Sequence, residues 1–139
     1  MAVSARWDVP ALKSGGLVAL VFAVPFSLGS RWAADRDEST LATILVIGAV
    51  LGFVLGAGCA AWVQRVELPL SHGLVTAVGT YIVAQAVFVV VRLARGGEVH
   101  WFALLFNLSV TVAAGLVGGI LGERLQAKGF RPSHMRDTP

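Results

Sequence analysis

The stretch that decides the fold is Thr111-Val-Ala-Ala-Gly-Leu-Val-Gly-Gly-Ile-Leu-Gly122, an apolar run in which small residues recur at every fourth position. In water such glycines weaken a helix, but in a bilayer they let two helix backbones approach closely enough for dispersion contacts to hold them together. The run therefore predicts a transmembrane helix with two adjacent packing faces, one formed by Thr111, Gly115 and Gly119 and the other by Gly118 and Gly122.

A second apolar run carries the same spacing, at Gly48, Gly52 and Gly56. The two glycine-bearing helices are expected to run in the same direction, so we expect their glycine faces to cross closely within one chain. The alternatives are that either face forms a seam between copies of the chain or a sliding surface.

The composition is that of a membrane protein. Of the 139 residues, 56% are hydrophobic and 14% are charged, and the mean hydropathy is +0.77, which lies far outside soluble globular usage. The net charge of +3 comes from basic residues scattered over predicted loops and tails, so we expect no nucleic-acid partner. The expected partners are membrane lipids and either further copies of the chain or a larger membrane-protein complex.

Hydropathy and helix-end signals predict an all-α integral membrane bundle, a single transmembrane domain over residues 1–139. The cleanly apolar part of the first span is short enough to resemble a signal peptide, but Lys13 can snorkel to the interface and lengthen the span. Pro25 is expected to kink that first helix. The expected helices are at about 11–28, 41–63, 70–91 and 99–121, followed by a cytoplasmic tail at 122–139.

The distribution of lysine and arginine predicts the orientation. Seven basic residues fall on the side of the two termini and four on the other side, so the positive-inside rule places both termini in the cytoplasm. The seven are Arg6, Lys13, Arg65, Arg124, Lys128, Arg131 and Arg136, and the four are Arg31, Arg36, Arg92 and Arg95.

A faint internal repeat favours two related halves. The segment Ser14-Gly-Gly-Leu-Val-Ala-Leu-Val21 aligns with Ser71-His-Gly-Leu-Val-Thr-Ala-Val78 at five of eight positions. Each segment opens a helix that is followed by a glycine-spaced helix leading back. The two halves would then be parallel repeats of one helical hairpin, although short apolar segments also match by chance.

A polar layer crosses the third and fourth predicted helices, and its members are Tyr81, Gln85, Asn107 and Thr111. At about 1.5 Å per residue, Gln85 and Asn107 both lie about 9 Å below the outer ends of their helices. Two interpretations remain open. The amides form an interhelical hydrogen bond, or they line a small polar site that opens outward beside the backbone carbonyl freed by Pro25.

The residues expected of an active site are missing from the predicted spans. No charged residue or histidine lies in the middle of a span, so a proton-coupled carrier built on an intramembrane carboxylate has no candidate. The three histidines His72, His100 and His134 lack the spacing of metal ligands. No phosphate-binding loop or nucleophile motif is present. We therefore expect no catalytic residues, no metal and no cofactor, and a chain that is not an enzyme.

Two segments resemble a family of small bacterial four-helix membrane proteins of unknown function. They are Ala113-Ala-Gly-Leu-Val-Gly-Gly-Ile-Leu-Gly122, which closes the fourth helix, and Gly52-Phe-Val-Leu-Gly56 followed by Ser71-His-Gly-Leu-Val75. The resemblance covers about residues 14–122 and implies four helices without an activity. The chain departs from the family at 66–69, where Val-Glu-Leu-Pro replaces a lysine- and glycine-rich link.

Together these features predict a multi-pass protein of the bacterial cytoplasmic (inner) membrane that acts as a packing, scaffold or accessory subunit through its glycine-rich helix faces. The alternative is a small homo-oligomeric channel or transporter with a polar site between the third and fourth helices. A cavity reaching Gln85 and Asn107 would favour the transporter, whereas a direct hydrogen bond without a void would remove it.

Overall fold

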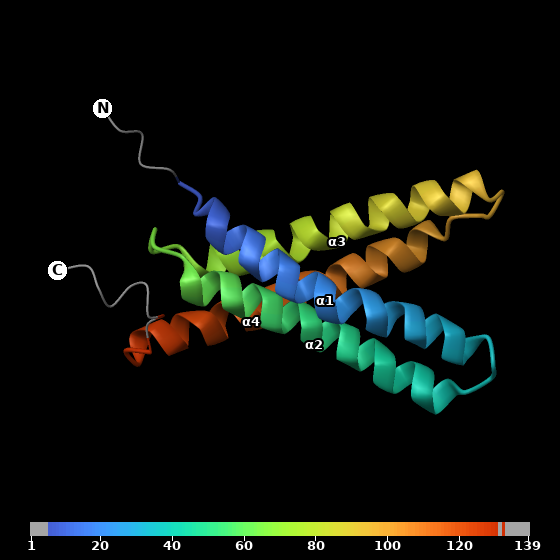
Figure 1. The fold of residues 1–139 in the computed structure, drawn as a ribbon, viewed down its shortest axis with the longest axis horizontal. Helices are drawn as coiled ribbons and strands as arrows, with labels where there is room; N and C mark the ends of the chain where they lie inside the picture. Colours follow the sequence, from blue (N-terminus) through green and yellow to red (C-terminus); the bar gives the residue numbers. More distant parts are fainter. Residues whose placement is uncertain (1–5, 131, 133–139) are drawn as a thin grey trace.

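The computed structural model describes residues 6–130 and residue 132, which form four helices (Figure 1). They are α1 (Val9–Ala34), α2 (Ser39–Val63), α3 (Pro69–Ala94) and α4 (Trp101–Ala127). Each of the four is long and apolar enough to cross a membrane. The prediction of an all-α bundle with four transmembrane helices is confirmed.

Two helices extend beyond their expected ends. The first was expected to end at about residue 28, but α1 continues through Arg31 to Ala34. The fourth was expected to end at about residue 121, but α4 takes in the start of the expected tail and ends at Ala127. Hydropathy marks where the apolar stretch ends, whereas backbone hydrogen bonding continues into the interface, where polar side chains are solvated. Pro25 lies inside α1, which stays helical on both sides of it; a kink there stays a prediction.

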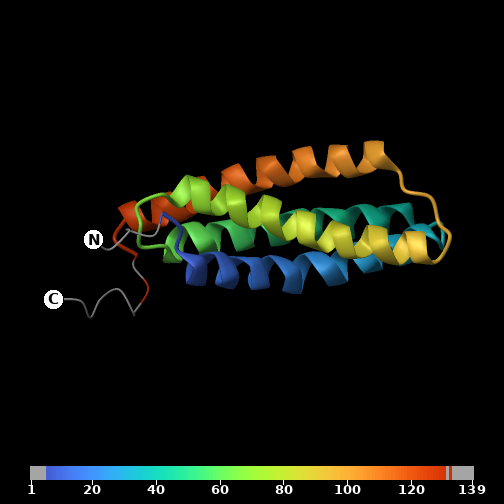
Figure 2. The ribbon, with the colours of Figure 1, turned by 90° about the horizontal axis from the view of Figure 1, so that it is seen from above.

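The four helices form two hairpins, α1–α2 and α3–α4, which cross one another. The helix α2 contacts all three others, while α1 and α4 make no contact within the part of the chain that the structure describes. The hairpins converge at the end where α1 begins and α4 ends, and they diverge toward the α1–α2 and α3–α4 loops (Figures 1 and 2). We call these the closed end and the open end of the bundle.

The core is built from small side chains. Among the described residues, every buried hydrophobic side chain except Tyr81 is an alanine. Large side chains such as Phe102, which is 83% exposed, instead cover the outside of the bundle. This arrangement suits a bilayer, because a leucine gains little on leaving lipid tails, whereas close backbone approach gains dispersion contacts.

Candidate functional site

The three glycines predicted for helix packing on α2 lie against α1. A Cβ atom added at Gly56 would come within 2.5 Å of the carbonyl oxygen of Gly15, so the two backbones are in direct contact. Gly52 and Gly48 lie in the same way against two phenylalanine side chains of α1. The α1–α2 hairpin is therefore held by a backbone contact that a methyl group would break.

The glycines of α4 divide between two neighbours. Gly118 and Gly122 face α2, where a Cβ atom added at Gly122 would lie 2.6 Å from a backbone carbonyl oxygen. Gly115 and Gly119 face α3, where a Cβ atom added at Gly73 would lie 2.7 Å from the Cα atom of Gly119. All four residues lie at helix contacts inside the chain.

The glycine face of α2 was expected to pack against the glycine face of α4, and this pairing is wrong. The helices α2 and α4 do pack together, but α2 contributes Gly58, which the four-residue spacing did not single out. The face of α2 that carries Gly56 is occupied by α1, its antiparallel hairpin neighbour. A face already covered by one helix is not available to a second.

Two members of the predicted polar layer are hydrogen-bonded and buried. The Tyr81 hydroxyl donates to the carbonyl oxygen of Leu104 at 2.8 Å, which joins α3 to α4. The Thr111 hydroxyl donates to the carbonyl oxygen of Asn107, one turn earlier in the same helix, also at 2.8 Å. Both hydroxyls are satisfied by backbone atoms.

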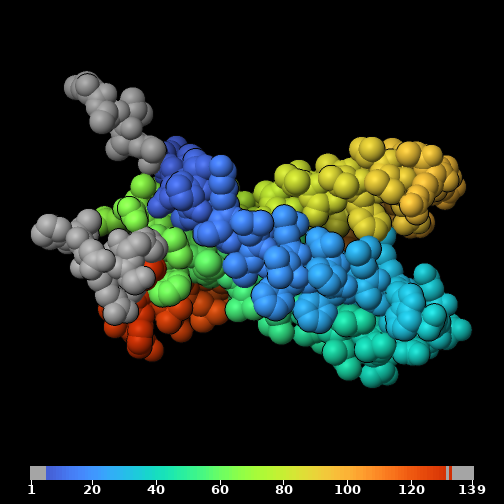
Figure 3. All heavy atoms as spheres, in the orientation of Figure 1, coloured from blue at the N-terminus to red at the C-terminus, as the bar shows by residue number. Residues whose placement is uncertain are grey.

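The other two members, Gln85 and Asn107, lie in the wall of one cavity of about 190 Å³. No hydrogen bond joins the two amides among those of the described residues. The cavity lies toward the open end, where the space-filling view shows the molecule hollowed between the two hairpins (Figure 3). Its lining residues are Arg31, Gln85, Phe88, Val89, Arg92, Val99, His100, Ala103, Leu104 and Asn107.

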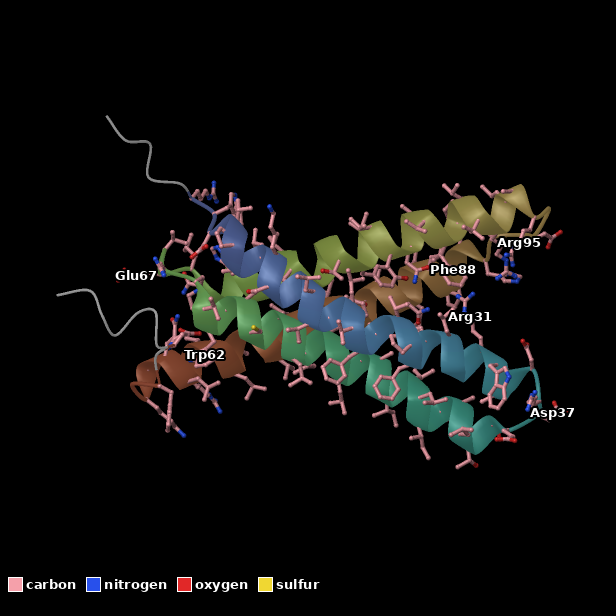
Figure 4. The ribbon with its side chains drawn as sticks, viewed as in Figure 1. Arg31, Asp37, Trp62, Glu67, Phe88 and Arg95 are labelled. Carbon is pink, nitrogen blue, oxygen red and sulfur yellow. The ribbon has the colours of Figure 1, made fainter. Side chains whose placement is uncertain are left out.

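Two arginines from different hairpins stand at this cavity. The Cζ atom of Arg31, on α1, lies 3.8 Å from the centre of the Phe88 ring on α3 (Figure 4). Arg92, in the last turn of α3, folds against the following loop, since a Cβ atom added at Gly97 would lie 2.9 Å from its Cγ atom. The cavity wall carries two guanidinium groups and no carboxylate.

Sequence reasoning did not assign a site role to the two arginines or to Phe88. Arg31 was placed in a loop because the apolar stretch before it ends at residue 28, yet α1 carries it onto the inner side of the bundle. One signal was available, since Arg31 and Arg92 each follow a predicted span that ends on the same side of the membrane. Only the crossing of the hairpins brings them to one cavity.

The closed end is held by a histidine that links α1 to α3. His72 is fully buried, and its Nε2 atom accepts a hydrogen bond from the backbone N–H of Asp8 at 2.9 Å. Its Nδ1 atom lies 2.8 Å from the carbonyl oxygen of Leu68 and donates to it. The ring is therefore neutral, with the proton on Nδ1. The Asp8 carboxylate in turn accepts from the backbone N–H groups of Ala11 and Arg65.

Two glutamines extend this network to α2 and α4. The Oε1 atom of Gln64, which is 2% exposed, accepts from the backbone N–H groups of Val66 and Leu68. Its Nε2 atom donates to Gln126 at 3.3 Å, and Gln126 donates to the carbonyl oxygens of Trp62 and Gln64. All four helices are thus hydrogen-bonded to one another or to a linking segment at the closed end, and this latch was not predicted.

One buried side-chain polar atom among the described residues has no partner. The hydroxyl of Thr76, a residue that is 3% exposed, forms no hydrogen bond. Its methyl group lies beside Gly15, at the contact between α1 and α3. A buried hydroxyl without a partner costs about 1–3 kcal/mol, so the contact between the hairpins is less favourable here than elsewhere.

A second hollow, of about 440 Å³, lies between α2 and α4 near the closed end. Its lining is apolar except for Arg124 and Lys128, which stand at its rim. Residues such as Leu55, Cys59 and Leu125 form the wall, and this surface suits a lipid acyl chain.

The described residues contain no group of three or more histidine, cysteine, aspartate or glutamate side chains that could hold a metal ion. No family model, curated protein or solved structure matches the chain.

Proposed function

We propose that this chain is a small homo-oligomeric transporter of the bacterial cytoplasmic membrane, with its solute site in the cavity between α1, α3 and α4. The observation that carries the proposal is the placement of Gln85 and Asn107, which both line one cavity and form no hydrogen bond with each other. Amides at such depth are costly unless a partner or a ligand satisfies them.

The shape of the bundle supports a carrier. The cavity lies toward the open end, while the opposite end is held by the hydrogen bonds of His72, Gln64 and Gln126. A carrier that works by alternating access needs a state in which its site is open to one side of the membrane and sealed from the other. The hairpins would then rock about the α2–α4 backbone contact at Gly58 and Gly118, while the unpartnered Thr76 hydroxyl weakens the packing between α1 and α3.

The direction of opening follows from the charge distribution. The first helix begins and the last helix ends at the closed end. More lysine and arginine residues lie on this side than on the other, which favours it as the cytoplasmic side. The cavity would then open to the outside in this state, and both termini would be cytoplasmic.

The scaffold interpretation has less support. It depended on glycine faces that could receive a partner, but the seven predicted packing glycines all lie against neighbouring helices of the same chain. Gly79, in contrast, has no neighbouring atom within 4 Å of an added Cβ atom. A partner subunit or a second copy would therefore bind mainly through larger apolar side chains.

The transporter proposal is tested by solute-induced currents. Purified protein in liposomes would be exposed to a panel of small organic anions and cations, and currents recorded on a solid-supported membrane. We expect at least one solute to give a protein-dependent current that Ala103→Trp abolishes, because the indole would fill the 190 Å³ cavity. Ala113→Trp is the matched control, on an exposed position of α4 outside the cavity. Wild-type currents no larger than those of empty liposomes for the whole panel would count against a transporter.

A further inference from the structure

We propose that the cavity binds a small organic anion, with a carboxylate or phosphate head held between Arg31 and Arg92 and a short apolar body directed toward Leu104. The proposal names the substrate class of the transporter proposed above and rests on that function for its transport consequence. Binding itself is a separate property and is tested separately.

The charges around the cavity are unbalanced. Arg31 and Arg92 both line the cavity and the charge of Arg92 acts unfavourably on Arg31, whereas Asp35, whose charge favours Arg31, is not part of the lining. Two like charges beside one small cavity repel each other, and a bound anion would convert that repulsion into two attractive interactions. A cationic ligand would add a third positive charge to the same wall.

The arginines are also held in position. The guanidinium of Arg31 lies over the Phe88 ring, and this contact restricts its rotamer. The stem of Arg92 is fixed by its contact with Gly97. A planar guanidinium whose rotamer is already restricted loses less entropy when it forms a bidentate contact with a carboxylate or a phosphate.

The other lining residues and the volume of the cavity restrict the size and polarity of the rest of the ligand. Gln85 and Asn107 add two amides that can donate hydrogen bonds to the lining, and Val89, Val99 and Leu104 add apolar surface. The volume of about 190 Å³ is below the roughly 300–1,000 Å³ that is usual for drug-sized ligands. The site therefore suits a compact molecule with one charged head.

The head has two possible sources, a water-soluble anion and an anionic lipid. Both would present the same negatively charged oxygens to the arginines. The cavity is too small to take two acyl chains, so a lipid would have to leave them outside, among the exposed apolar side chains. The experiment below separates the two sources.

The test is a binding titration in nanodiscs, with benzoate and phenyl phosphate as anionic probes, benzylamine as the cationic probe and benzyl alcohol as the neutral one. We expect the two anions to bind to the wild type and the cation not to bind. Arg31→Gln and Arg92→Gln should each weaken anion binding about tenfold or more, the value of one charge-assisted contact. Arg95→Gln, which removes the same charge from an exposed position at the same end, should leave it unchanged.

Three further measurements test the role of the guanidinium, the source of the anion and the folding of the variants. Arg31→Lys retains the charge without the planar fork, so it should bind anions more strongly than Arg31→Gln if the glutamine variant is correctly folded. Phosphatidylglycerol added to phosphatidylcholine nanodiscs should weaken benzoate binding to the wild type if a lipid head competes for the site, and should leave it unchanged if the natural ligand is soluble. Thermal unfolding of every variant shows whether the fold is retained.

The proposal is overturned if neither anion binds, if benzylamine binds as strongly, or if Arg92→Gln binds anions like the wild type. These results are distinguishable from a failure of the transporter proposal. Anion binding without a current would remove the transporter and leave the site, whereas a current carried by benzylamine alone would leave the transporter and remove the anion site.

Discussion

The guanidinium of Arg31 lies 3.8 Å from the centre of the Phe88 ring, and this contact joins α1 of one hairpin to α3 of the other. Arg31 and Phe88 lie toward the end where the hairpins diverge (Figure 4). The latch formed by His72 and the two glutamines holds the other end. The bundle is thus held by many backbone contacts and hydrogen bonds at one end and by a cation–π contact toward the other. The first prediction follows from that asymmetry.

Replacing Phe88 by leucine should lower the free energy of unfolding by about 1 kcal/mol, since the cation–π contact is lost while an apolar side chain remains. The measurement is thermal or denaturant unfolding in a fixed detergent. Phe102→Leu is the matched control, because Phe102 is 83% exposed and should change stability little. Equal effects of the two substitutions would show that the Arg31 contact contributes nothing.

Replacing Gly56 by alanine should destabilise the bundle strongly, because the new methyl group would lie within 2.5 Å of the Gly15 carbonyl oxygen. Gly79→Ala should have the opposite effect, since nothing lies within 4 Å of an added Cβ atom there and alanine is favoured over glycine in a helix by about 1 kcal/mol. Unfolding of both variants in the same detergent checks the pair. A stable Gly56→Ala protein would mean that the α1–α2 seam is not as close as described.

Replacing Thr76 by valine should raise the free energy of unfolding by about 1 kcal/mol, because it removes a buried hydroxyl that has no partner and keeps the shape of the side chain. Thr111→Val is the contrasting variant, since its hydroxyl donates to the Asn107 carbonyl oxygen. That substitution should be neutral or destabilising. A Thr76→Val protein less stable than the wild type would indicate that the hydroxyl has a partner.

Water should reach Asn107 from one side of the membrane. In a Cys59→Ser background, which removes the chain's single cysteine, an Asn107→Cys variant should react with a membrane-impermeant maleimide added outside intact cells. Ala113→Cys, on an exposed position of the same helix outside the cavity, should stay unlabelled in lipid. Labelling of Asn107→Cys only after the membrane is opened would place the cavity on the cytoplasmic side and reverse the proposed orientation.

The helices themselves were predictable because each one satisfies its own backbone hydrogen bonds and is selected by local hydropathy. The predicted ends at residues 63 and 91 lie close to Val63 and Ala94, while those at residues 28 and 121 fall well before Ala34 and Ala127. The missed turns carry polar residues such as Arg31, which a hydropathy pattern assigns to a loop. Because Arg31 was assigned to a loop, the α1 side of the cavity could not be predicted.

The sequence by itself determined that this chain makes four membrane-spanning helices and that glycines such as Gly56 and Gly115 lie where backbones approach. Only the tertiary structure decided which helix each glycine meets, that Gln85 and Asn107 face a cavity, and that Arg31 and Arg92 stand together at its wall. The physical reason is that lipid tails and leucine side chains are equally apolar. Hydropathy therefore reports that a helix lies in the membrane, but it does not report which of its faces meets a neighbour.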